Sequence, residues 1–118
     1  MGVRNALPEG NELQQVGRDT VRLLAEIIRT CSHEKVAHAA VASMGPSFAE
    51  KVRVAAGDLD LSTGAFAARV VRDFDECSGE AERQAIRKAM GGSDQPILTG
   101  LRLILQPIIE ERVAERVR

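Results

Sequence analysis

Residues 96–109 read PILTGLRLILQPII, the most apolar stretch of the chain. Arg102 is its only charged residue, and Pro107 lies inside it. Placed on a helix at about 100° per residue, the stretch has one apolar side about 140° wide. The members of this stripe are Ile97, Leu98, Leu101, Ile104, Leu105, Ile108 and Ile109. A stripe of this kind predicts a helix that is buried, either in a core or against a partner.

Two features of the predicted helix point to a partner surface. Leu103 falls outside the stripe, so we expect its side chain to be exposed. Pro107 has no N–H to donate to the carbonyl of Leu103, so we expect a kink there. The predicted partner interface therefore comprises Leu103, Pro107, Ile108 and Ile109. Because a core helix and an interface helix have similar compositions, both interpretations of the stripe stay open at this point.

The rest of the chain has the 3.6-residue apolar spacing of helices and few strand signals. We predict an all-α fold, a single compact bundle of five to six helices spanning residues 11–118, after a flexible N-terminal arm over residues 1–10. The helices that form the core are expected to be the first, the fourth and the last. Before the last helix, the predicted elements are Asn11–Cys31, His33–Met44, Phe48–Ala56, Thr63–Cys77 and Glu80–Met90.

Local sequence also predicts where these helices begin and end. Ser32 and Ser62 are candidate N-caps, and Asp94 is a candidate cap for the last helix. Ser47 and Glu50 have the S-x-x-E spacing of a capping box. Glycine favours helix ends, so Gly57 is expected to end the third helix.

Composition narrows the function classes. The 118 residues carry a net charge of −1, and the sequence pI of about 6.1 makes nucleic-acid binding unlikely on charge grounds, because such domains are usually basic. No apolar run approaches the ~20 residues that span a bilayer, and the first residues lack the apolar core of a signal peptide. We therefore expect a cytoplasmic protein with no membrane association and with Cys31 and Cys77 reduced. Both cysteines lie on apolar stripes and are expected to be buried.

Two weaker candidate sites remain as alternatives. Cys31, His33, Glu34 and His38 are residue types that bind transition metals, but His33 and His38 diverge by about 140° around a helix. We expect a half-buried His33 and a surface His38, with a metal or small-molecule site (His33, Glu34, His38) as the alternative. Residues 47–74 are a candidate helix-turn-helix, whose second helix would offer DNA the residues Ser62, Thr63, Arg69 and Arg72.

The leading functional expectation is a non-enzymatic helical interaction or regulatory module that self-associates. No catalytic constellation can be assigned, no cofactor fingerprint is found, and aliphatic residues are plentiful for a small domain. We therefore expect no cofactor and a homo-oligomer, with a further protein partner as a second possibility. A DNA-binding regulator and a small-molecule or metal-binding protein are the alternatives.

Overall fold

The computed structural model describes residues 19–117, and all regular structure within that range is helical. The predicted all-α bundle is therefore confirmed. A first helix is described over residues 19–31, and the others are α2 (Glu34–Ala42), α3 (Pro46–Asp58), α4 (Thr63–Cys77), α5 (Glu80–Gly91) and α6 (Pro96–Val117). The predicted arm over residues 1–10, and the part of the first predicted helix before residue 19, lie outside the described residues. None of the described helices is both long and apolar enough to cross a membrane.

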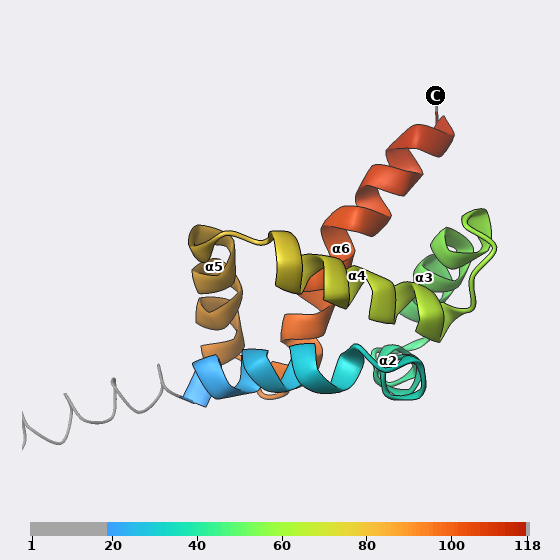
Figure 1. Cartoon of the computed structure of the whole chain (residues 1–118). Helices are drawn as coiled ribbons and strands as arrows, with labels where there is room; N and C mark the ends of the chain where they lie inside the picture. Colours follow the sequence, from blue (N-terminus) through green and yellow to red (C-terminus); the bar gives the residue numbers. More distant parts are fainter. Residues whose placement is uncertain (1–18, 118) are drawn as a thin grey trace, which may run out of the picture.

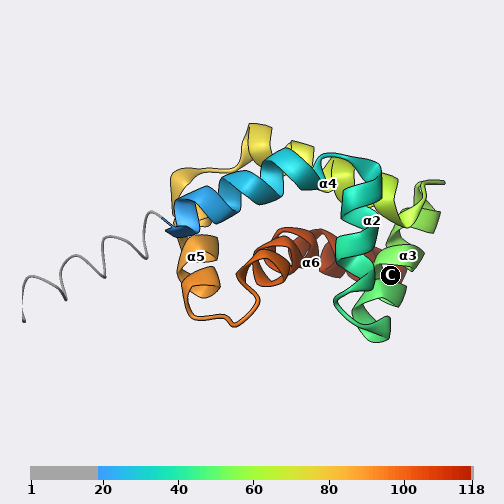
Figure 2. The same cartoon turned by 90° about the horizontal axis from the view of Figure 1, so that it is seen from below.

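Helix α4 lies at the centre of the bundle and packs against α2, α3 and α6. The first helix runs along α4, and α5 stands at one end of the molecule, with α2 and α3 at the other (Figure 1). Seen from below, α6 passes between these two ends (Figure 2). Helix α6 contacts α2, α3, α4 and α5, so the two most central helices are α4 and α6.

The core is built from one face of each helix, as the apolar spacing predicts. Helix α4 contributes most, because seven of its residues are buried: Gly64, Phe66, Ala67, Ala68, Val70, Val71 and Phe74. From α6, four residues of the predicted stripe are buried: Leu101, Ile104, Leu105 and Ile109. The first helix adds Leu24, Ile27 and Cys31. The core also extends to α2 and α3 through Ala37, Val41, Phe48, Val52, Ala55 and Ala56.

Local chemistry explains why α4 begins where it was predicted to begin. The Ser62 hydroxyl accepts a hydrogen bond from the amide of Ala65 at 3.1 Å, which confirms Ser62 as the N-cap. The turn before it places Asp60 in the left-handed region, with φ at 59°. The amide of Leu61 donates to the carbonyl of Ala56 at 2.9 Å, and the amide of Asp60 donates to the carbonyl of Gly57 at 3.0 Å. These bonds form a Schellman motif, which turns the chain from α3 into α4.

The predicted caps of α2 and α3 are wrong, and each has a local cause. Ser32 donates its hydroxyl back to the carbonyl of Ile28, and the N-cap position of α2 belongs to His33. Helix α3 begins two residues earlier than predicted, because Pro46 occupies its first turn after Gly45. Ser47 therefore lies inside the helix and the capping box does not form.

The ends of α3 and α6 also differ from the prediction. Gly57 continues α3 to Asp58, because the left-handed position falls on Asp60, a residue type that tolerates it. At the start of α6, the side-chain bond to the backbone comes from Ser93 and not from Asp94. The Ser93 hydroxyl accepts from the amide of Gln95 at 3.1 Å.

Helices α2 and α4 approach closely enough to place backbone against backbone. Gly64 makes this possible, because a Cβ there would lie well inside contact distance of the Glu34 carbonyl oxygen and 3.0 Å from Cβ of His38. Arg72 strengthens the same contact, since its guanidinium donates to the Ser32 carbonyl at 2.8 and 3.2 Å. Two contacts therefore hold α4 against the start of α2 and the turn before it, one at Gly64 and one at Arg72.

Candidate functional site

The predicted metal ligands do not form a site. His33 and His38 are both exposed, so the expected half-burial of His33 is wrong, whereas the surface position of His38 is confirmed. Glu34 points to the start of α4, where the Ser62 hydroxyl donates to its Oε1 at 2.9 Å. Within residues 19–117, side chains of His, Cys, Asp and Glu form no cluster of three or more that could hold a metal ion.

The candidate DNA-reading residues have mostly structural roles. Ser62 caps α4 and binds Glu34, Arg72 binds the Ser32 carbonyl, and Thr63 is half-buried. Only Arg69 is exposed without such a bond among the described residues. A recognition helix needs an open face for the major groove, but α4 is the central core helix. The arrangement gives a DNA-binding role little support.

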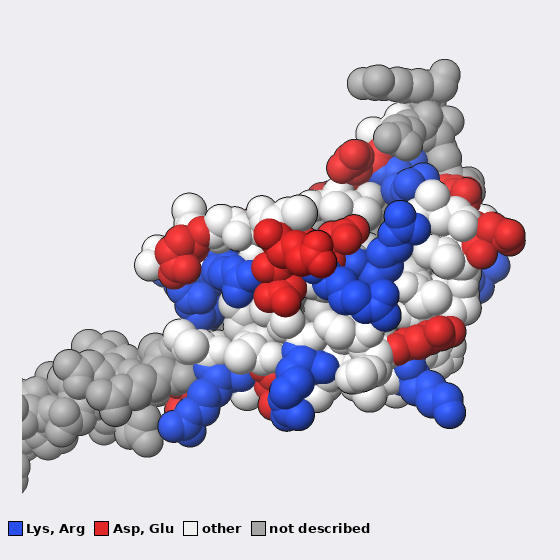
Figure 3. Space-filling view, viewed as in Figure 1, with Lys and Arg blue, Asp and Glu red and all other residues white. Residues whose placement is uncertain are grey.

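The exposed face of α4 is also acidic towards its C-terminal end. Asp73, Asp75 and Glu76 are all exposed there, and the space-filling view shows acidic side chains gathered over this part of α4 beside a group of basic ones (Figure 3). Carboxylates at this position would repel the phosphate backbone of DNA.

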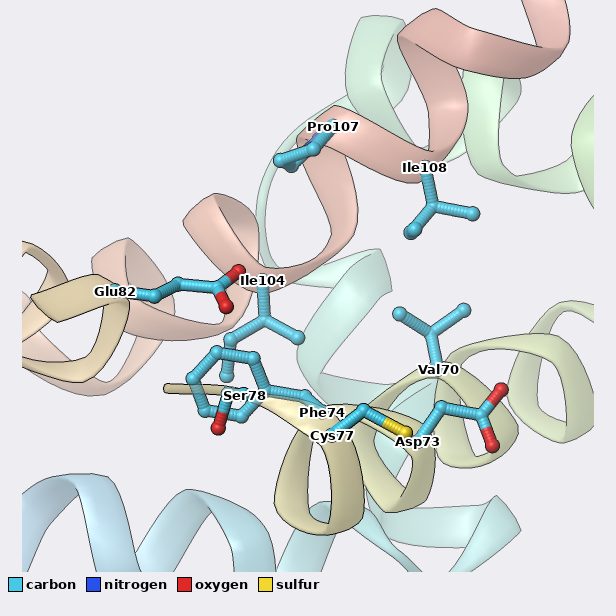
Figure 4. Close-up of a pocket in the computed structure, with 9 residues that line it drawn as sticks. All are labelled: Val70, Asp73, Phe74, Cys77, Ser78, Glu82, Ile104, Pro107 and Ile108. Atoms are coloured by element: carbon cyan, nitrogen blue, oxygen red, sulfur yellow. The ribbon is translucent and has the colours of Figure 1, made fainter. Parts of the chain in front are cut away.

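A groove between α4 and α6 is the best candidate for a functional site. Its volume is about 230 Å³, and it is lined by Val70, Asp73, Phe74, Cys77, Ser78, Glu82, Ile104, Pro107 and Ile108. Val70 and Phe74 rise from α4, while Ile104 and Ile108 reach down from α6 to face them (Figure 4). The groove is therefore an apolar channel between the two central helices, open to solvent where α6 leaves the bundle.

The charged residues of the groove are all acidic. Glu82 and Asp73 lie at opposite sides of it (Figure 4), and no lysine or arginine lines it. Within the described part of the chain neither carboxylate has an ion-pair or hydrogen-bond partner. The nearby cation Arg83 is engaged elsewhere, because its guanidinium donates to the Asp75 carbonyl at 2.8 Å and lies over the ring of Phe74, 5.5 Å from the centroid. The groove thus combines an apolar floor with unneutralised negative charge at its rim.

The predicted interface residues are divided between this groove and the core. Pro107 is exposed and Ile108 is 36% exposed, and both line the groove. Ile109 is buried, with 3% exposure. Leu103 is half-buried and packs against the core, so the expectation that it is exposed is wrong. The side of α6 that carries Leu103 is covered because other helices surround the first half of α6.

Sequence reasoning missed the other wall of the groove. Val70 and Phe74 are buried residues of α4, and Glu82 lies in the first turn of α5, a helix with few apolar residues. The sequence does carry a weak signal that the two carboxylates lie near each other. Asp73 lies near the end of α4, and Glu82 lies in the first turn of the next helix. Only the packing of α4 against α6 brings them to one groove.

The two cysteines have opposite environments. Cys31 is buried, as predicted, whereas Cys77 is exposed at the end of α4 and lines the groove, so its predicted burial is wrong. The cause is that the stripe of α4 reaches the end of the bundle at Phe74, one turn before Cys77. Burial raises the pKa of the Cys31 thiol, partly offset by a hydrogen bond from Thr30.

We expect native protein at neutral pH to expose one reactive thiol per chain. Cys77 should react promptly with a chromogenic disulfide reagent, because its sulfur is accessible. Cys31 should react only after unfolding, because both its burial and its raised pKa keep it a protected thiol. Absorbance of the released thiolate measures both. The Cys77→Ser variant is the control and should show no fast phase; two equally fast thiols in the wild type would contradict the assignment.

In comparisons with known proteins, no family model, curated protein or solved structure matches this chain.

Proposed function

We propose that this chain is a non-enzymatic protein–protein interaction or regulatory module that self-associates through the groove side of α6. The observation that carries the proposal is the position of Pro107 and Ile108. Both are exposed, and both border an apolar groove between α4 and α6 (Figure 4). Exposed apolar residues that gather beside a groove mark interaction sites more often than isolated ones do.

The size of the groove supports a protein partner over a small ligand. Pockets for small molecules and cofactors usually have volumes of about 300–1,000 Å³ and enclose most of the ligand. At about 230 Å³, this groove is smaller and open, which suits a few side chains from another helix. Burying apolar side chains in such a groove contributes about 25 cal/mol per Å² of apolar surface removed from water.

Substituting Ile108 tests the proposal. The wild-type chain should scatter light as a particle near twice 12.8 kDa at micromolar concentrations. Ile108→Glu should shift it towards the monomer, with dissociation at least about tenfold easier, because a charge would be buried in an apolar contact. Circular dichroism should show an unchanged fold, since Ile108 is 36% exposed in the monomer.

Val36→Glu is the matched control. Val36 is 44% exposed on α2, away from the groove, so the same substitution there should leave the particle mass unchanged. A wild-type chain that remains monomeric would overturn the proposal. Equal dissociation of the two variants would show that the groove side of α6 has no special role.

A further inference from the structure

Helix α4 carries a line of side chains that borders the α4–α6 groove. Ala65, Arg69, Asp73 and Cys77 follow one another at four-residue spacing, so they lie along one side of the helix. Ala65 is half-buried, and the other three are exposed. Asp73 and Cys77 also line the groove. The line therefore adjoins the face through which we propose that the chain self-associates.

This line contains one cation and one anion that do not pair with each other. Arg69 and Asp73 are about one turn apart, yet neither has an ion-pair or hydrogen-bond partner among the described residues. At this spacing the favourable order places the acidic residue first, and here the order is reversed. The adjacent cation Arg72 is engaged with the Ser32 carbonyl. Both charges of the line are thus available to a second molecule.

A helix side with this charge order is complementary to itself. When two identical helices lie antiparallel, the second helix presents the same residues in the reverse order. Arg69 of each copy then lies opposite Asp73 of the other, and both charges are neutralised together. A two-fold axis generates such a reciprocal contact, and rows of residues four apart are the ridges through which helices most often pack. The space-filling view shows basic and acidic side chains next to each other over α4 (Figure 3).

We propose, as an extension of the proposed self-association, that two copies of this chain pack α4 against α4 across a two-fold axis between Arg69 and Asp73. The charges determine the position of the axis. An axis at Asp73 would bring two carboxylates together, and like charges at an interface repel one another. Val70 lies between the two charges in the sequence and faces Ile108 of α6 (Figure 4), so apolar side chains adjoin the same axis. Glu82, on the opposite side of the groove, is exposed and stays in water.

Reversing the two charges tests the pairing. In Arg69→Glu each contact would join two carboxylates, and in Asp73→Lys each would join two cations. Each single variant should therefore dissociate at least about tenfold more readily than the wild type in light scattering. The double variant, with Arg69→Glu and Asp73→Lys in one chain, exchanges the signs of both contacts and keeps them complementary. It should dimerise like the wild type, and so should an equimolar mixture of the two single variants.

Lys88→Glu is the matched control for Arg69→Glu. The substitution changes the net charge by the same amount, but Lys88 is exposed on α5 and does not line the groove. Its dimer should be as stable as that of the wild type. Circular dichroism should show the same helix content for all variants, because every substituted residue is exposed.

The possible outcomes separate this inference from the proposed function. Dissociation of both single variants and recovery in the double variant support the α4 pairing. A wild-type dimer that Ile108→Glu disrupts, but that neither single charge variant weakens, would overturn the α4 pairing and retain the self-association. Single variants that dissociate without recovery in the double variant would also overturn it, because the two charges would then not face each other. A monomeric wild type would overturn both proposals.

Discussion

Replacing Gly64 with alanine is expected to lower the free energy of unfolding by about 1–3 kcal/mol, the usual cost of overpacking. A Cβ at this position would press on the Glu34 carbonyl oxygen, with Cγ of Glu34 and Cβ of His38 each 3.0 Å away. The first of these is backbone, so relief requires α2 and α4 to separate. The intrinsic preference of helices for alanine would gain at most about 1 kcal/mol, which does not offset the clash.

Gly57→Ala is the matched control for this prediction. Gly57 also lies inside a helix, near the end of α3, but a Cβ there would have no heavy atom within 4 Å. Alanine should therefore raise stability by up to about 1 kcal/mol. Urea and thermal unfolding followed by circular dichroism would measure both variants. If Gly64→Ala were as stable as Gly57→Ala, the close contact between α2 and α4 would be wrong.

Truncating Leu105 to alanine is expected to cost about 2–5 kcal/mol, as for other fully buried leucines. Leu105 is 0% exposed and lies where α6 passes α4. Leu103→Ala is the comparison in the same helix, with the same change in helix propensity. Because Leu103 is only half-buried, Leu103→Ala should lower the free energy of unfolding by less than half as much as Leu105→Ala.

The leucine pair is best measured in the Ile108→Glu background, where assembly does not add to the free energy of unfolding. Urea unfolding gives both values under the same conditions. Equal losses at Leu105 and Leu103 would mean that α6 is not oriented as described, with one side in the core. A stripe that served only as a dimer interface would show little effect of Leu105→Ala in this monomeric background.

Sequence patterns were most reliable for α4. Its bounds and its Ser62 cap follow from residues within one or two turns of one another, and the structure confirms them, whereas the predicted burial of Cys77 on its apolar stripe is wrong. A local pattern failed where an adjacent residue favoured a different helix start. The pair Ser47 and Glu50 has the spacing of a capping box, but α3 starts at Pro46, two residues before the predicted start, so Ser47 lies inside the helix. Glu50 then binds Arg53, whose Nε donates to its Oε1 at 2.9 Å.

Only part of the candidate site was accessible to sequence reasoning. Pro107 and Ile108 were identified from an apolar run broken by a proline, and both line the groove. Val70, Phe74 and Glu82 could not be assigned to it, because they lie on other helices. The sequence contains no local signal for which residues of α4 lie beside which residues of α6.

The amino-acid sequence alone thus determined that the chain is helical, where α4 begins and ends, and that residues 96–109 form a helix with one buried side. These properties depend on contacts between residues three or four positions apart and on caps. The tertiary structure decided which apolar residues stay covered. Leu103 is sheltered and Ile108 is not, and Cys31 is buried while Cys77 is exposed, because burial depends on where neighbouring helices end and not on the period of the helix that carries the residue.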